Sequence, residues 1–231
     1  MINISELAFR YRGRGSNLES SFSMQVQEFA VPLGASTALV GPSGSGKTTL
    51  LGLIAGTLRA TSGSIIVNDQ AITGFSDNEL GRYRIRSVGQ VFQAFELLGY
   101  LTVIENVMLP WYISGNGVKA DIRKRAADLL LDVGLESKQS AMPGELSQGE
   151  QQRVAVCRAM LNNPPVLLAD EPTGNLDQAN KQNVVDLLVE QAKRNNSTLL
   201  MVTHDESLLN KFDSVLDMRN VAQPLEVKSQ R

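Results

Sequence analysis

Cysteine, histidine and tryptophan each occur once in this chain of 231 residues, and aromatic residues make up only 5% of it. With Cys157 as the one thiol, no disulfide can form within the chain, and a reduced compartment such as the cytoplasm fits. The longest apolar runs, such as residues 166–169, fall far short of the roughly 18–20 residues that a membrane helix needs. A net charge of −2 provides no overall basic field, so we expect no nucleic acid partner.

A glycine-rich segment provides the first positive signal. Residues 37–40 are typical of a short buried strand, and they lead directly into a G-x-x-x-x-G-K-T motif at residues 41–48 and a helical pattern over 48–55. The glycines let backbone N–H groups turn toward phosphate oxygens, and the helix N-terminus adds its dipole. Lys47 is expected to reach the β- and γ-phosphates of ATP, and the Thr48 hydroxyl to bind Mg²⁺. The predicted phosphate-binding residues are Gly41, Pro42, Ser43, Gly44, Ser45, Gly46, Lys47, Thr48 and Thr49.

Two acidic residues follow a second apolar strand. Residues 166–169 lead into Asp170 and Glu171, and a buried parallel strand directs its carboxyl end toward the ligand crevice of an α/β sheet. Taken alone, the pattern fits an ordinary strand with an acidic loop. Beside a P-loop, Asp170 suits the Mg²⁺ shell, and Glu171 suits the base that orients and polarises the attacking water.

A third segment, Leu-Ser-Gln-Gly-Glu-Gln-Gln-Arg at residues 146–153, begins a helix. Ser147 and Glu150 have the spacing of a capping box, so one interpretation is simply a well-capped helix. The other is an anion site, because free N–H groups and a serine hydroxyl converge at such a helix N-terminus. The residue pattern alone leaves both interpretations open.

The remaining pattern predicts an α/β chain with a helical insertion. Residues 1–31 indicate β-structure with a glycine-rich turn at 12–17, and an Asn-Asp turn at 68–69 indicates a hairpin. From residue 95 to about 163 the pattern is helical, with an apolar stripe formed by Ile122, Ala126, Leu129, Leu130 and Val133. Further strands are expected at residues 88–92, 166–169, 198–202 and 214–218, and a further helix at 178–194.

Two basic segments are expected to be solvated rather than functional. Residues 82–86 alternate arginine with tyrosine and isoleucine, which we interpret as the edge of a strand or loop. Residues 119–125 are interpreted as a charged helix face.

The three segments, together with Val-Thr-His-Asp at residues 202–205, resemble the nucleotide-binding subunit of ATP-binding cassette (ABC) transporters. Their order and spacing match over about residues 2–218. The resemblance implies an α/β fold: a P-loop NTPase core with an N-terminal antiparallel β subdomain and an inserted α-helical subdomain. It implies one ABC ATPase domain over 1–231, with the core at 1–93 and 164–231 and the helical subdomain at 94–163.

The resemblance also assigns roles to single residues. Tyr11 would stack on adenine, and Gln93 would contact Mg²⁺ and the attacking water, so that Glu171, His204 and Gln93 form the catalytic set and Thr48, Gln93 and Asp170 the metal-binding set. His204 would hydrogen-bond the γ-phosphate. Asp177 would lie in a loop that crosses a dimer interface. The segment Ser147, Gln148, Gly149 and Glu150 would touch the γ-phosphate bound to the opposite subunit.

One position departs from the family pattern. Gln148 stands where most members have glycine, while Ser147 and Gly149 are unchanged. The predicted contact of this segment with ATP is unaffected by the departure, whereas the rate of ATP turnover is left undetermined.

The resemblance further implies partners: a homodimer in the ATP-bound state, and an integral-membrane permease that holds the chain at the cytoplasmic face of the inner membrane. Residues 94–115 would form the permease contact, with Trp111 and Tyr112 in or near it or else packed locally. The stretch 91–110 is similar to the branch that serves lipoprotein release, macrolide export and cell division. An amino-acid-importer type, a soluble ABC ATPase and a P-loop kinase are the alternatives, and the kinase leaves the 146–153 segment unexplained.

Overall fold

Two β-sheets organise the computed structural model, which describes residues 1–11, 22–115 and 120–223. The first sheet is antiparallel, with strand order β2-β1-β4-β5. Its strands are β1 (Ile2–Arg10), β2 (Ser23–Val31), β4 (Ser62–Val67) and β5 (Gln70–Ala71). Ile2, Ile4, Leu7 and Phe9 of β1 are all buried in one core. Strict alternation would place the first pair and the second pair on opposite faces of the strand. The register irregularity between Ser5 and Ala8 brings both pairs to the same face. The sequence-based prediction of β-structure in this region is confirmed, and the turn at 12–17 lies outside the described residues.

The second sheet is parallel, with strand order β6-β7-β8-β3-β9. Its strands are β3 (Ser36–Val40), β6 (Val88–Phe92), β7 (Val166–Asp170), β8 (Thr198–Val202) and β9 (Ser214–Asp217). All five residues of β8 are buried, as expected for a strand covered on both faces.

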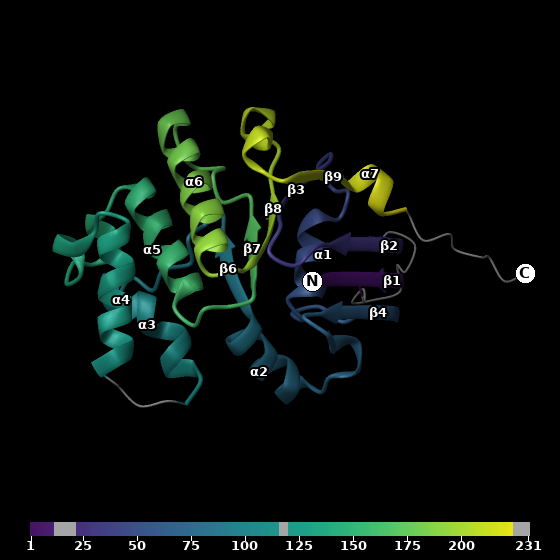
Figure 1. Cartoon of the computed structure of the whole chain (residues 1–231), viewed down its shortest axis with the longest axis horizontal. Coiled ribbons are helices and arrows are strands. Elements are labelled where there is room, and N and C mark those ends of the chain that lie inside the picture. Colours follow the sequence, from purple (N-terminus) through teal and green to yellow (C-terminus); the bar gives the residue numbers. More distant parts are fainter. Residues whose placement is uncertain (12–21, 116–119, 224–231) are drawn as a thin grey trace, which may run out of the picture.

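Helices cover both faces of this parallel sheet (Figure 1). The helices are α1 (Lys47–Ile54), α2 (Asp77–Ser87), α3 (Val103–Ile113), α4 (Ala120–Asp132), α5 (Gln148–Met160), α6 (Gln178–Arg194) and α7 (Met218–Val221). Short 3₁₀ turns lie at Ile72–Gly74, Glu136–Lys138, Pro143–Glu145 and Glu206–Lys211. Figure 1 shows α3, α4 and α5 together as a lobe at the left, with α1 on the other side of the parallel sheet. None of the helices in the described ranges has the length and apolarity to cross a membrane.

The parallel sheet separates two apolar cores. Leu199 and Met201 of β8 face the core that α3, α4, α5 and α6 build, while Leu200 and Val202 face the core shared with α1 and the antiparallel sheet. Trp111 is partly buried against the first core, as is Tyr112, so both contribute to local packing. The predicted stripe of α4 is confirmed, since Ile122, Ala126, Leu129 and Leu130 are buried. The subdomain boundaries at 93 and 163 stay a prediction.

The interpretation of residues 82–86 as a strand or loop edge is wrong, because they lie in helix α2. Ser76 caps this helix, and its backbone N–H donates to Glu79 Oε2 at 2.8 Å in a complete capping box. Leu80 and Tyr83 form the buried side, with the Tyr83 hydroxyl donating to Ile54 O at 2.8 Å. The alternation of arginine with apolar residues imitated a strand, whereas the capping box of Ser76 and Glu79 was the helix signal. Lys119, the first residue of the other basic segment, lies outside the described residues.

Strand β6 packs closely against α5 at Gly89. A Cβ on Gly89 would lie 2.5 Å from Ala159 O and 2.9 Å from Pro164 Cγ. We expect Gly89→Ala to lower the free energy of unfolding by about 1–3 kcal/mol through overpacking, measured by urea denaturation.

Gly81, within α2, is the matched control. A Cβ there would meet only the far end of Arg84 at 4.0 Å, so Gly81→Ala should raise stability by roughly 0.5–1 kcal/mol through helix propensity. Equal effects of the two substitutions would contradict the close approach at Gly89.

Candidate functional site

The predicted site residues follow four neighbouring strands at one edge of the parallel sheet. Phe92 of β6 pairs with Asp170 of β7, Asp170 with Val202 of β8, and Val202 with Leu39 of β3. The four strands therefore end level with one another. Gln93, Glu171, His204 and the loop that begins at Gly41 all follow directly, and the fold brings them to one crevice.

The loop over residues 41–46 wraps around the lysine that follows it. Lys47 is 7% exposed, and its Nζ donates to Gly41 O at 2.8 Å and Pro42 O at 2.9 Å. Gly46, the N-cap of α1, has φ 96°, and a Cβ there would lie 2.8 Å from Phe22 Cζ. A left-handed backbone and a close neighbour thus both require glycine. The ammonium and the helix N-terminus converge as a phosphate site needs.

Thr48 and Asp170 provide adjacent oxygen ligands. Thr48 Oγ1 donates to Asp170 Oδ1 at 3.2 Å. Burial raises the pKa of Asp170, while the Thr48 hydrogen bond and Lys47 lower it. Among the described residues no group of three or more His, Cys, Asp or Glu could hold a metal alone. The donor set fits Mg²⁺, which favours one or two protein oxygens and takes its other ligands from phosphates and water.

Glu171 lies beside the single histidine. Glu171 Oε2 is 3.4 Å from His204 Nδ1, and the Glu171 side chain is 28% exposed. The residue has φ +46°, uncommon for glutamate, and its N–H donates to Val202 O at 3.1 Å. Backbone strain and a hydrogen bond to the neighbouring strand therefore occur together at this residue, which is common at functional sites.

Gln93 contacts the loop that follows Glu171. Its Nε2 lies 2.6 Å from the position that a Cβ on Gly174 would occupy, and Gln93 O accepts from Asn175 Nδ2 at 3.1 Å. The segment after β6 and the segment after β7 are therefore in direct contact. A movement of Gln93 would therefore act directly on the loop that follows Glu171.

Tyr11 lies near the start of α1. Its hydroxyl is 3.3 Å from Thr49 Oγ1, and its ring meets Phe9 edge to face with centroids 4.8 Å apart. The side chain is 42% exposed. The position agrees with the predicted adenine contact, and that role stays a prediction.

The N-terminus of α5 carries the predicted segment at residues 146–153. Ser147 caps the helix, and its N–H donates to Glu150 Oε2 at 2.8 Å. These hydrogen bonds lower the pKa of Glu150, the backbone N–H of Ser147 contributing most. Gln148 and Gly149 occupy the first turn, where backbone N–H groups lack partners within the helix.

Helix α6 begins beside this turn. Asp177 caps α6, accepting from Asn180 N at 2.9 Å, and this bond is the largest cause of the lowered pKa of Asp177. Asn180 Oδ1 also lies 2.8 Å from the position that a Cβ on Gly149 would occupy. The first turns of α5 and α6 therefore pack together. Asn180 was missed by the sequence analysis, because nothing in its position marks it as a contact.

The two halves of the predicted site do not meet within one chain. Helices α5 and α1 lie on opposite sides of the parallel sheet (Figure 1). In the part of the chain that the structure describes, no recorded hydrogen bond or ion pair joins residues 41–49 to residues 147–150. Within one chain, the phosphate site at Lys47 and the N-terminus of α5 are therefore separate.

A buried arginine holds the segment after Gln93. Arg158 of α5 is 8% exposed, and it donates to Phe95 O at 2.7 Å and also to Glu96 O. Phe95 and Glu96 both have positive φ, at 61° and 51°. The sequence analysis missed this residue, although a charge inside the apolar stripe of a helix was a signal for it.

Comparison with known proteins agrees with this geometry. A family model described as ABC transporter matches residues 24–174. The chain belongs to the ABC transporter family. The ABC ATPase fold predicted from the sequence is confirmed, as are ATP binding and ATPase activity.

Named relatives and solved structures give the same result for this ABC ATPase. The lipoprotein-releasing system ATP-binding protein LolD of Psychrobacter arcticus is 42% identical over 205 residues, covering 87% of this chain and 91% of that protein. LolD of Xanthomonas campestris is 43% identical over 191 residues, covering 83% and 80%. The dimeric post-hydrolysis state of the ATP-binding cassette MJ0796, bound to ADP and Pi, aligns with a TM-score of 0.84 at 30% identity, covering 98% of this chain and 100% of that one.

Lys47 gives the direct test of the phosphate site. We expect Lys47→Ala to weaken ATP binding by roughly ten- to a hundredfold, the loss of about 1.5–3 kcal/mol from charge-assisted hydrogen bonds, measured by isothermal titration calorimetry. Lys124→Ala is the control, because Lys124 is an exposed lysine paired with Asp128 on α4. An unchanged dissociation constant in Lys47→Ala would argue against the assignment.

Proposed function

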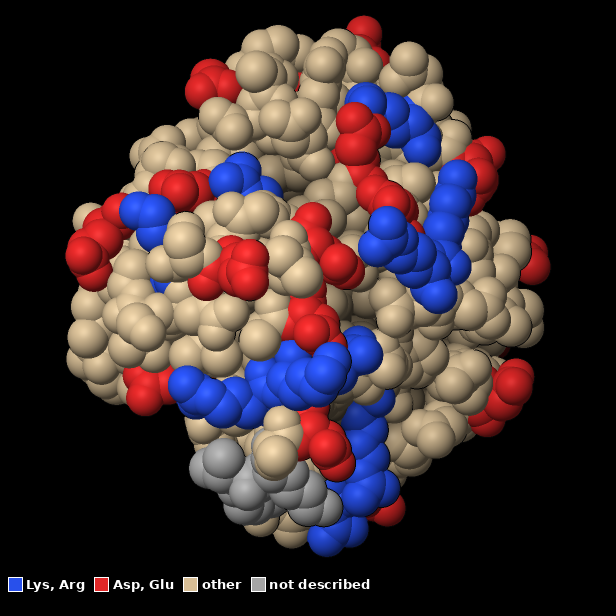
Figure 2. Space-filling model, turned by 60° about the vertical axis from the view of Figure 1, so that its left-hand side comes forward, with Lys and Arg blue, Asp and Glu red and all other residues tan. Residues whose placement is uncertain are grey.

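We propose that this chain is the ATP-hydrolysing subunit of an ABC transporter complex of the lipoprotein-release type, which couples ATP-driven dimer closure and hydrolysis to an integral-membrane permease. The observation that carries the proposal is the 42–43% identity to proteins named LolD over 83–87% of the chain. The permease holds the chain at the cytoplasmic face of the inner membrane. Figure 2 shows acidic and basic side chains intermixed on the face that it draws.

The nucleotide site is completed by a second copy. Lys47 and the loop of one protomer bind the triphosphate, and the α5 turn at 147–150 of the other contacts the γ-phosphate. Two such sites related by a twofold axis make an isologous dimer. The separation of α1 from α5 within one chain supports this arrangement, as does a neighbour described as dimeric. ATP stabilises the dimer because it binds the closed state better, and hydrolysis removes the bridging phosphate.

The chain's own residues prepare the attack of water on the γ-phosphate. Glu171 accepts a proton from the water and orients it, while His204, 3.4 Å from Glu171, hydrogen-bonds the γ-phosphate. Thr48 and Asp170 would hold Mg²⁺ with Gln93, and the ion would neutralise charge on the phosphates. Gln93 aligns the water through its contact with the loop after Glu171. As the water oxygen bonds to the γ-phosphorus, the bond from that phosphorus to the bridging oxygen breaks and ADP leaves. The proton taken up by Glu171 then passes to the phosphate product.

The permease contact lies over residues 94–115. An apolar groove of about 300 Å³ supports this placement, and Phe92, Pro110 and Ile113 help to line it. Phe92 is 37% exposed and Ile113 64%, more than a buried core permits. Because Phe92, which lines the groove, directly precedes Gln93, a segment seated in the groove would move with the catalytic loop.

Glu171 tests the hydrolysis mechanism. Glu171→Gln should retain ATP binding but stop phosphate release, because the amide cannot accept the proton. ATP should then trap a dimer on a sizing column. Glu136→Gln, an exposed acid in a 3₁₀ turn of the helical lobe, should turn over ATP normally. Wild-type turnover in Glu171→Gln would defeat the assignment of the base.

Ser147 tests whether the α5 N-terminus acts on nucleotide or only caps a helix. Ser147→Ala should cost about 1 kcal/mol of stability and also reduce ATP hydrolysis by roughly tenfold or more. Ser76→Ala removes the equivalent cap from α2 and should cost similar stability, but leave hydrolysis unchanged. Equal activity in the two variants would reduce Ser147 to a cap.

A further inference from the structure

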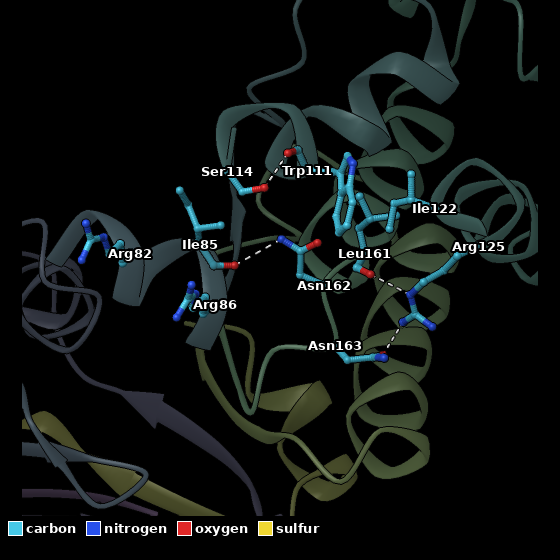
Figure 3. A pocket seen from close by; sticks show the side chains of 10 residues that line it. All are labelled: Arg82, Ile85, Arg86, Trp111, Ser114, Ile122, Arg125, Leu161, Asn162 and Asn163. Atoms are coloured by element: carbon cyan, nitrogen blue, oxygen red, sulfur yellow. Dashed lines mark hydrogen bonds between the residues drawn. The ribbon is translucent and has the colours of Figure 1, made fainter. Parts of the chain in front are cut away.

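A cavity of about 490 Å³ lies between α2 and the helical lobe. Figure 3 shows Arg86 of α2 on one side, with Arg125 of α4 and Asn163 on the other. Trp111 and Ile122 form part of its apolar wall. The proposed ATPase mechanism uses none of these residues.

Arg125 and Asn163 are polar groups of the lining with donors to spare among the described residues. Arg125 Nε donates to Leu161 O at 2.6 Å, and Arg125 Nη2 donates to Met160 O at 3.2 Å and to Asn163 Oδ1. These bonds fix the orientation of both side chains. Arg125 Nη1 and Asn163 Nδ2 then have no recorded partner within the described ranges, and each can donate to a ligand.

The charge of the lining is one-sided. Arg82, Arg86 and Arg125 contribute three guanidinium groups, and the described residues that line the cavity include no aspartate or glutamate. Arg82 and Arg86 stand at i and i+4 on α2, a spacing at which like charges destabilise a helix. For Arg86 no ion pair with any described residue is recorded. An anionic group in the cavity would offset this repulsion, and a guanidinium fork binds a carboxylate through two hydrogen bonds.

The cavity adjoins the apolar groove assigned to the permease. Ile85 and Asn162 line both hollows, so an occupant of one reaches the other. We propose, on the basis of the function given above, that Arg82, Arg86, Arg125 and Asn163 form a carboxylate pocket, and that the permease segment seated in the groove places an acidic side chain in it.

One protein segment fits both hollows at once. An amphipathic helix that lies in a groove presents apolar anchors three or four residues apart, and an acidic residue at the same spacing would reach the neighbouring pocket. The apolar anchors would supply affinity, and the carboxylate would select this permease and fix its register. Partner choice by the ATPase thus depends on charge at α2.

Arg86 gives the sharpest test, because its side chain has no recorded hydrogen bond or ion pair with a described residue. The permease of the complex is reconstituted alone in nanodiscs of phosphatidylcholine, and binding of the full chain is titrated. Arg86→Glu should weaken binding by about tenfold or more, because a charge pair becomes a repulsion. Arg86→Lys should retain most of the affinity. ATP hydrolysis by the isolated chain should be unchanged in both variants, since Arg86 lies outside the nucleotide site.

Arg123→Glu is the matched control, because Arg123 is an exposed arginine of α4 that does not line the cavity. Wild-type affinity in Arg86→Glu, or equal losses in Arg86→Glu and Arg123→Glu, would overturn the pocket. A loss that appears only when phosphatidylglycerol is added to the nanodiscs would assign the pocket to a lipid headgroup and likewise overturn the proposal. If the unaltered chain itself fails to bind the permease, the proposed function fails rather than the pocket.

Discussion

Burial of the parallel sheet on both faces is the constraint on which the site depends. Alternate residues of β8 face different cores, so a shift of one residue would exchange the two apolar sets. The register is therefore fixed, and with it the level at which β3, β6, β7 and β8 end. Four loops distant in sequence meet there because the apolar strands that precede them cannot slide. The packing of the apolar strands therefore fixes the positions of the functional groups in the crevice.

The charged groups at this edge of the parallel sheet lower the stability of the fold. Burial raises the pKa of Asp170, so its ionised form is disfavoured in the fold, and Glu171 adds a second carboxylate with a strained backbone. Lys47, folded into the loop at 41–46, supplies the nearest compensating charge. Such an arrangement favours ligands that bring both anionic oxygens and a cation. Nucleotide with its metal ion meets that description, whereas either one alone would leave part of the charge unmatched.

The sequence predicted most of the core and of the crevice, because each motif adjoins a strand of recognisable pattern. The P-loop follows the strand at residues 37–40, and Asp170 follows the apolar residues 166–169. In both places the hydrophobic pattern predicted a strand and the motif stood at its carboxyl end. Helix α2 was misassigned because the alternation at 82–86 outweighed the capping box at Ser76. Contacts such as those of Arg158 and Asn180 could not be predicted, since they depend on how helices far apart in sequence approach one another. Residue roles that need nucleotide or a second copy rest on the resemblance.

Arg158 gives α5 a second point of attachment. The first turn of the helix carries Ser147, and three turns later Arg158 grips the carbonyls of Phe95 and Glu96. Between these points the helix is continuous and mostly buried, with no proline to bend it. The helix therefore acts as a rigid element that is held at both ends. A displacement of its first turn would therefore be passed along the helix to the carbonyls that Arg158 holds beyond Gln93.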